Sequence, residues 1–314
     1  MPNPNRPILL LLDWDSTLTT TSTLPLIASI ATLPLIHPSL PALTAAYTAD
    51  LKRHDDTYIP AKRDRTSIDQ ELIYLSSLSA VEKASVERLE AAGIFKDVGA
   101  NDIDVAAAAC WDRESVTLPS GWRRMVESVL RRGKVGIVSV AWSRRFIEQV
   151  LREADRAAGG EGGVGDEVAV VANDISGDGS GGLDRWFGGK RVWSAADKGA
   201  VMGEFVGEFA SRSDGSGVGE RPVVVYIGDS VTDLMCLVQA DIGICIRDEV
   251  LTGEQEALRE VLVRVGVECF SIKEFSRGLD GLDGGGRRLW SAMDFEEVFE
   301  SGVFDGVLDG VGVS

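Results

Sequence analysis

The chain has 314 residues, of which 44% are hydrophobic, and a formal net charge of −17 at pH 7. This length predicts one large domain with an insertion, or two domains, and the apolar content suffices for a proper core. The negative charge argues against nucleic-acid backbones and anionic membranes as partners. No apolar run is long enough to span a bilayer, and residues 1–7, MPNPNRP, lack the form of a signal peptide. We therefore expect a soluble, cytoplasmic protein.

The first predicted element is a buried strand over residues 8–12, ILLLL. A continuous apolar run of this length is typical of a strand in a parallel sheet that helices cover on both faces. The run ends in Asp13 and Asp15, which Ser16 and Thr17 follow. Ligands of open α/β sheets bind beyond the carboxyl ends of the strands, so both carboxylates lie where chemistry is expected. Taken alone, the segment fits an ordinary Asp/Ser/Thr turn equally well.

Residues 24–117 are expected to be mostly helical, with helices over 68–78 and 80–93 whose Glu, Lys and Arg residues suit an exposed face. Within this region the segment 58–65, YIPAKRDR, concentrates three positive charges in an otherwise acidic chain. A solvated basic turn is the favoured interpretation of this segment. Contact with a substrate phosphate or carboxylate is the alternative.

A second strand is predicted at residues 135–139, VGIVS, which end in the hydroxyl of Ser139, and a helix opens behind it at residues 141–143. The Ser139 hydroxyl and the free amides that follow, including that of Val140, suit an anion. A plain serine helix cap is the alternative. Trp142 fits either stacking on a flat substrate ring or ordinary packing.

The next features are a strand at residues 168–173 and an amphipathic helix that Asp197, Lys198 and Gly199 open. A lysine at a helix start opposes the macrodipole and is unfavourable unless an anion compensates it, although such a lysine is usually just solvated. The glycine-rich loop 159–165 lacks the setting of a dinucleotide-binding fingerprint. Residues 211–220 and 278–286 are expected to form polar loops.

Residues 223–227, VVVYI, form another predicted strand that ends in acidic residues, Asp229 and Asp233, in the run Gly228-Asp229-Ser230-Val231-Thr232-Asp233. Two acidic strand ends on one parallel sheet face each other at its carboxyl edge. Neighbouring carboxylates raise each other's pKa, and a hard divalent cation with oxygen ligands, such as Mg²⁺, relieves that repulsion.

The histidines and cysteines narrow the chemistry further. The chain has two histidines, His37 and His54, and neither lies near these motifs, which argues against a zinc site and against histidine acid/base catalysis. Four cysteines, at positions 110, 236, 245 and 269, lack metal-binding spacing and are expected to be reduced packing thiols. A short helix is expected around residues 293–300.

The order of these residues, and the elements on which they lie, resemble the four motifs of the haloacid dehalogenase superfamily of phosphotransferases. The four matching positions in this chain are Asp13-Trp14-Asp15-Ser16-Thr17, Ser139, Lys198, and Gly228-Asp229-Ser230 with Asp233. The stretches 21–28, 138–143, 226–237 and 240–244 are similar to the phosphoserine-phosphatase-like branch. They are especially similar to the phosphatase domain of plant thiamine-monophosphate phosphatases.

The resemblance implies a doubly wound, Rossmann-like α/β core over residues 1–23 and 118–314, with a helical cap domain over 24–117. It implies that Asp13 attacks phosphorus to form an aspartyl-phosphate and that Asp15 is the acid and base. Mg²⁺ would be held by Asp13, the Asp15 backbone carbonyl and Asp229. The remaining implied site residues bind the phosphate (Ser139, Val140 and Lys198) or support the site (Asp233, Thr17, Ser230 and Trp142).

Three interpretations stay open. The first is a Mg²⁺-dependent phosphatase for a small metabolite, with thiamine monophosphate or a related vitamin phosphate as the leading substrate. The second is the same enzyme class acting on phosphoserine, a nucleoside monophosphate, pyridoxal phosphate or a sugar phosphate. The third is a non-catalytic binding or regulatory protein that retains the fold, which the complete set of motif residues does not favour.

Overall fold

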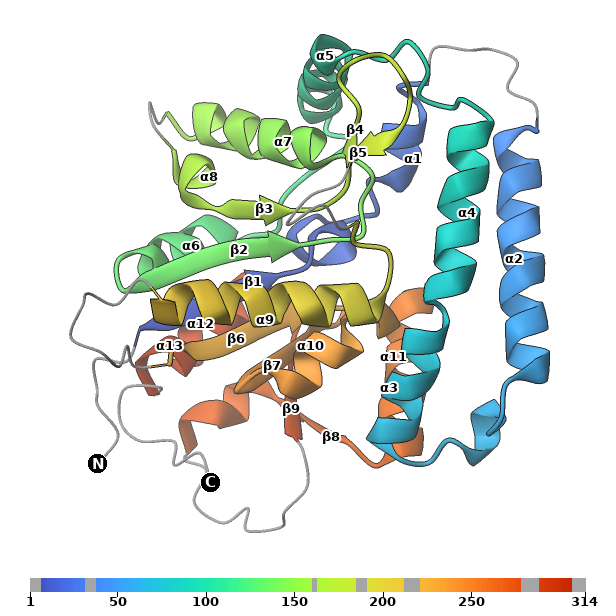
Figure 1. Cartoon of the computed structure of the whole chain (residues 1–314). Coiled ribbons are helices and arrows are strands. Elements are labelled where there is room, and N and C mark those ends of the chain that lie inside the picture. Colours follow the sequence, from blue (N-terminus) through green and yellow to red (C-terminus); the bar gives the residue numbers. More distant parts are fainter. Residues whose placement is uncertain are drawn as a thin grey trace.

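The computed structural model describes residues 7–31, 38–159, 163–184, 191–211, 221–277 and 288–306. Seven strands form one sheet in the order β3-β2-β1-β6-β7-β9-β8, and all neighbours in it are parallel (Figure 1). From β1 the chain first adds β2 and β3 on one side and later adds β6 and the following strands on the other. The doubly wound α/β fold is therefore confirmed. They are β1 (Ile8–Leu12), β2 (Gly133–Val138), β3 (Ala169–Val171), β6 (Val223–Gly228), β7 (Ile242–Ile246), β8 (Glu268–Ser271) and β9 (Arg288–Ala292).

Strand β1, which lies between β2 and β6, brings the acidic strand ends together. Leu12 pairs with Ile137 of β2 on one side and with Ile227 of β6 on the other. Because all three strands run in the same direction, the residues that follow them meet at one edge of the sheet. The strand order also reverses at β1, which makes this edge the switch point where open α/β sheets bind ligands.

Helices cover both faces of the sheet, which explains the unbroken apolar run of β1. Ile8, Leu10 and Leu12 belong to one buried cluster, and Leu9 and Leu11 belong to the other. The first cluster includes side chains of α6 (Trp122–Leu130), α7 (Arg144–Ala157) and α12 (Phe295–Glu300); the second includes side chains of α9 (Ala195–Ser211), α10 (Leu234–Gln239) and α11 (Gly253–Val265).

The region between β1 and α6 is helical, as expected. Figure 1 shows α4 and its neighbour α2 beyond the sheet, on the side towards which the arrow of β2 points. Helix α3 packs on α9, and α5 packs on α7. The helices are α1 (Leu24–Ala28), α2 (Leu40–Thr57), α3 (Ile68–Ser77), α4 (Ser79–Ala91) and α5 (Ala100–Asp112), and a 3-10 turn covers Lys62–Asp64.

The basic segment 58–65 is only partly a solvated turn. Arg63 is exposed, and Lys62 forms an exposed ion pair with Glu260. Arg65 is instead buried: its Nε donates to Glu71 Oε2 at 2.8 Å, and Arg264 Nη1 of α11 donates to the same oxygen at 3.0 Å. We call these three side chains the Arg65–Glu71–Arg264 group. The expectation of a fully solvated turn is wrong for Arg65 because a buried guanidinium needs a charged partner.

Other boundaries differ slightly from those expected. Helix α4 ends at Ala91, because Gly93 adopts a φ of +67° that a helix cannot continue. The stretch before α9 forms the antiparallel hairpin β4 (Asp174–Ile175) and β5 (Leu183–Asp184). The expected loop 278–286 and residues 212–220 of the other lie outside the described residues.

The last elements are short. They are helices α8 (Val164–Glu167) and α13 (Val303–Gly306) and 3-10 turns at Val231–Asp233 and Ile272–Arg277. Within the described ranges, no helix combines the length and the apolar character that crossing a membrane requires.

Candidate active site

Asp13 is the first residue beyond β1. Its backbone N–H donates to the carbonyl of Ile227 at 2.9 Å, which extends the ladder to β6 by one bond and fixes the direction of the side chain. The chain then turns sharply over Trp14–Leu18, with Ser16 at a φ of 56°. Asp13 and Asp229 are both buried, so the first acidic strand end meets the second inside the protein.

Lys198 supplies the positive charge of the site. It lies in the first turn of α9, where Asp197 Oδ2 accepts hydrogen bonds from the backbone N–H and the hydroxyl of Ser194. The Lys198 side chain is fully buried, and its Nζ lies 2.7 Å from Asp13 Oδ1 and 2.7 Å from Asp233 Oδ1. From sequence, this lysine was either solvated or compensated by an anion, and the structure shows two carboxylates that compensate it.

Asp233 orients Lys198. Its Oδ1 also accepts the Tyr226 hydroxyl at 2.7 Å, and its Oδ2 accepts the hydroxyl of Ser230 at 3.0 Å and the backbone N–H of Asp229 at 3.3 Å. Burial acts to raise the pKa of Asp233, but the Lys198 ammonium and these hydrogen bonds outweigh burial and hold the pKa below its ordinary value. Both oxygens of Asp233 therefore already have partners.

The two carboxylate oxygens of Asp229 differ in their surroundings. Thr17 Oγ1 donates to Asp229 Oδ1 at 3.1 Å. Asp229 Oδ2 is buried and accepts no hydrogen bond from the residues that the structure describes. Burial and the nearby charges of Asp13 and Asp233 raise the pKa of Asp229 to about 9. Burial and the charge of Asp233 likewise raise the pKa of Asp13 to about 7.

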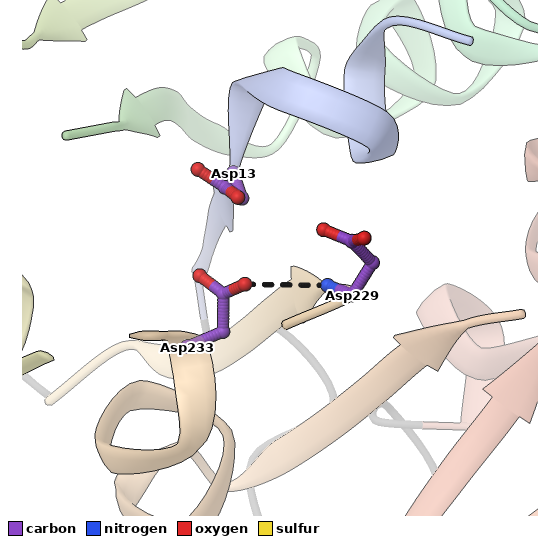
Figure 2. A group of neighbouring side chains, drawn as sticks. All are labelled: Asp13, Asp229 and Asp233. Carbon is purple, nitrogen blue, oxygen red and sulfur yellow. Dashed lines mark hydrogen bonds between the residues drawn. The ribbon is translucent and has the colours of Figure 1, made fainter. Parts of the chain in front are cut away.

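The three aspartates form a group that suits a hard cation (Figure 2). One carboxylate oxygen from each of Asp13, Asp229 and Asp233 lies within 4.8 Å of the others. One lysine faces these three carboxylates, and an unpartnered buried oxygen is costly. Mg²⁺ fits this donor set better than zinc does, because the ligands are all oxygens.

The predicted acid/base residue lies beside this group. Asp15 Oδ1 accepts the Thr23 hydroxyl at 2.7 Å and also the Thr23 backbone N–H. Burial raises the pKa of Asp15, while the Thr23 hydrogen bonds and Lys198 oppose that rise. The Asp15 side chain is not one of the three grouped carboxylates. This agrees with the family resemblance, which implies that Asp15 binds a metal only through its backbone carbonyl.

Ser139 and Val140 follow β2, one strand away from Asp13. The Ser139 hydroxyl is buried and accepts the N–H of Ala141 at 3.0 Å. The cap of α7 is Ser143, whose hydroxyl accepts the N–H of Phe146 at 3.1 Å, so the helix-cap interpretation of Ser139 is wrong. Trp142 packs edge-on against Phe95, with ring centroids 5.8 Å apart, which matches ordinary packing.

Three residues of the site were not predicted. The Tyr226 hydroxyl binds Asp233, and Thr23 binds Asp15. Asn173 is buried, and its Nδ2 donates to the carbonyls of Val140, Ala141 and Val192, which joins the segment after Ser139 to the segment before α9. The available signal for Tyr226 was a single hydroxyl in a buried strand, because a buried tyrosine usually finds a partner.

Comparison with known proteins identifies relatives. No family model matches the chain. It is 26% identical over 251 residues to a CTO1 family protein of Schizosaccharomyces pombe, which covers 76% of this chain and 82% of that protein. It is 28% identical over 200 residues to the mitochondrial Bifunctional TH2 protein of Arabidopsis thaliana, with 62% of this chain and 28% of that protein covered. The chain thus matches only a part of the longer TH2 protein.

Solved structures that match the chain include a phospho-aspartyl intermediate analogue of phosphoserine phosphatase, at 14% identity and a TM-score of 0.47, with 94% of this chain and 98% of that chain covered. A phosphoserine phosphohydrolase-like protein from Francisella tularensis has 14% identity, a TM-score of 0.45 and coverage of 93% and 98%. By its motifs, its doubly wound sheet and its site, the chain is similar to the phosphoserine-phosphatase-like branch of the haloacid dehalogenase superfamily.

Proposed function

We propose that the protein is a Mg²⁺-dependent phosphomonoester hydrolase that works through an aspartyl-phosphate. One observation carries this proposal: Lys198 Nζ bridges Asp13 and Asp233 beside the unpartnered oxygen of Asp229. Three carboxylates and one lysine at the switch point of an α/β sheet suit a substrate that brings its own negative charge and needs a cation to bind.

In this proposal Asp13 is the nucleophile. Lys198 Nζ donates to Asp13 Oδ1, which keeps a second lone pair for the metal. Asp13 Oδ2 then forms a bond to phosphorus while the bond from phosphorus to the leaving oxygen breaks. Asp15 donates a proton to that oxygen. Asp15 then takes a proton from the water that attacks phosphorus, which releases phosphate and regenerates the Asp13 carboxylate.

The phosphoryl oxygens need positive or hydrogen-bonding partners because the protein as a whole is acidic. Lys198, the Ser139 hydroxyl and the Val140 amide are the proposed partners. Asp13, the Asp15 carbonyl and Asp229 would hold Mg²⁺. When bound, the ion offsets the charge of the carboxylates and of the phosphoryl group.

The test is phosphate release from p-nitrophenyl phosphate by the purified chain with Mg²⁺. We expect Asp13→Asn to lower kcat/KM at least about 1,000-fold, because the amide cannot attack phosphorus. Asp56→Asn, which changes an exposed carboxylate of α2, is the matched control and should leave the rate unchanged. Full activity of Asp13→Asn would show that Asp13 is not the nucleophile, whereas an inactive wild type with Mg²⁺ bound would support the non-catalytic alternative.

The leading proposed substrate is thiamine monophosphate or a related vitamin phosphate. The proposed location of the protein is the cytoplasm. The support is the resemblance of residues 21–28, 138–143 and 226–237 to plant thiamine-monophosphate phosphatases. A panel with phosphoserine, a nucleoside monophosphate, pyridoxal phosphate and a sugar phosphate tests it. Thiamine monophosphate should have the highest kcat/KM, and turnover no faster than that of p-nitrophenyl phosphate would remove it as the substrate.

A further inference from the structure

We propose that Thr23 and Trp14 are positioning residues for Asp15, and that they direct its Oδ2 towards the leaving group. This inference rests on the proposed function and deepens it. It concerns the proton-transfer half of the reaction, whereas the Asp13 test concerns nucleophilic attack. The two can therefore fail separately.

The three side chains form a hydrogen-bond relay. Trp14 Nε1 donates to Thr23 Oγ1 at 3.1 Å, and Thr23 Oγ1 donates to Asp15 Oδ1 at 2.7 Å. The Thr23 backbone N–H donates to the same Asp15 oxygen. Trp14 and Thr23 are fully buried, so water does not compete for these bonds.

The direction of the relay follows from the donors available. An indole N–H only donates, so the Thr23 hydroxyl must accept from Trp14. The hydroxyl has a single proton, and it points to Asp15 Oδ1. That oxygen thus accepts from two groups that cannot take a proton from it. In the described part of the chain the hydrogen bonds of Asp15 all involve Oδ1, so Oδ2 is the oxygen left to exchange a proton with substrate and water.

A second observation separates this role from ordinary helix capping. Thr23 is the N-cap residue of α1, yet its hydroxyl makes no capping hydrogen bond to that helix. Threonine at this position normally binds a backbone N–H of the first turn. The Thr23 hydroxyl is used for Asp15 instead, at the point where the chain leaves the sheet for the helical region. The start of α1 and the orientation of Asp15 are therefore coupled.

The dependence of rate on the leaving group tests the proposal. Thr23→Val removes the hydroxyl, keeps the backbone N–H and preserves the shape of the side chain. Phenyl phosphate needs protonation of its leaving oxygen far more than p-nitrophenyl phosphate does. We expect Thr23→Val to lower kcat/KM for phenyl phosphate about 10- to 100-fold, which is part of the roughly 100- to 10,000-fold that acid catalysis contributes, because Asp15 stays in place. We expect it to lower kcat/KM for p-nitrophenyl phosphate less than about threefold.

Two further variants complete the test. Thr23→Ser keeps the hydroxyl and should restore the wild-type ratio of the two rates. Trp14→Phe removes the indole donor and should change the ratio in the same direction as Thr23→Val, which keeps the proposal testable if Thr23→Val does not fold. An equal loss of kcat/KM on both substrates would indicate a merely structural role, and an unchanged ratio in both variants would likewise overturn the proposal. Either result leaves the proposed phosphatase activity intact as long as Asp13→Asn is inactive.

Discussion

At the scale of single residues, charge balance around Lys198 holds the site together. Burial acts to lower the pKa of Lys198, but the carboxylates of Asp13 and Asp233 outweigh burial and raise it. Lys198 therefore stays charged at neutral pH. Each of the two carboxylates has the Lys198 ammonium as a counter-ion at 2.7 Å. This ion pair replaces the hydration that the carboxylates lose on burial.

We expect Lys198→Met to destabilise the protein by about 3–5 kcal/mol, because it leaves two buried carboxylates without their cation. Urea unfolding measures the change. Lys52→Met is the matched control, since Lys52 forms an exposed pair with Asp56, and it should show no measurable change. A Lys198→Met protein as stable as the wild type would show that this ion group does not hold the fold.

The roles of Lys198 and Thr23 differ in how far sequence could predict them. Lysine in a first helical turn is locally unfavourable, and that conflict indicated a nearby anion. Thr23 lies eight residues from Asp15, across a turn that depends on the left-handed backbone of Ser16. No periodicity or spacing rule encodes that turn, so the contact was visible only in three dimensions.

At the scale of elements, close packing at the end of β6 sets the position of Asp233. A Cβ atom on Gly228 would lie 2.5 Å from Asp233 Cγ and 2.7 Å from its Cβ. Only glycine leaves room for Asp233 to approach the strand and reach Lys198. The glycine that ends β6 is therefore a packing requirement of the site.

Gly228→Ala should displace Asp233, destabilise the protein by about 1–3 kcal/mol through overpacking and lower phosphatase activity. Gly203→Ala in α9 is the control, because a Cβ there meets no atom within 4 Å. That change should stabilise the helix by about 0.5–1 kcal/mol. Thermal unfolding of both variants distinguishes the site from the helix, and equal shifts of the same sign would contradict this explanation.

The Arg65–Glu71–Arg264 group gives a second prediction at this scale. Glu71→Gln leaves two guanidinium groups with no carboxylate, and we expect a loss of about 3–5 kcal/mol in the free energy of unfolding. Glu87→Gln on α4, whose exposed partner is Lys83 at 3.7 Å, should change nothing measurable. Urea titration compares the two, and similar stabilities would mean that water reaches the Arg65 group.

Elements with a strong apolar pattern could be predicted, and two short strands of mixed composition could not. The apolar runs of β1 and β6 and the helix of Lys198 were all expected. The strands β8 and β9 were not, because ECFS and RLWSA are short and mix polar with apolar residues. Pairing with neighbours far along the chain decides their conformation.

At the scale of the whole molecule, the grouped carboxylates link stability to pH and to cations. Burial and neighbouring charges raise the pKa values of Asp229 and Asp13 from 3.8 to about 9 and about 7. A carboxyl whose pKa rises on folding binds more protons in the folded state. Without a cation, folding stability therefore falls as pH rises from about 4 towards 9.

We expect the melting temperature of EDTA-treated protein to fall between pH 5 and pH 9, and Mg²⁺ to restore it more at pH 9 than at pH 5. Calorimetry with and without Mg²⁺ measures both effects. Asp229→Asn should flatten the pH dependence and weaken the Mg²⁺ effect, whereas Asp56→Asn should do neither. An equal Mg²⁺ increment at both pH values would argue against a cation at Asp229.

One pair of threonines has a consequence for how the helical region, and with it the substrate range, can change. The Thr20 N–H donates to the Thr117 carbonyl at 3.1 Å, and their hydroxyls lie 2.7 Å apart. The chain thus leaves the sheet for the helical region, which the family resemblance implies is a cap, and returns from it at a single point. The intervening residues form a loop with joined ends, which different helices could replace if they keep the packing of α3 on α9 and the partner of Arg264. Grafting a cap from another phosphatase between these two threonines would then exchange substrate range while the chemistry stays in place.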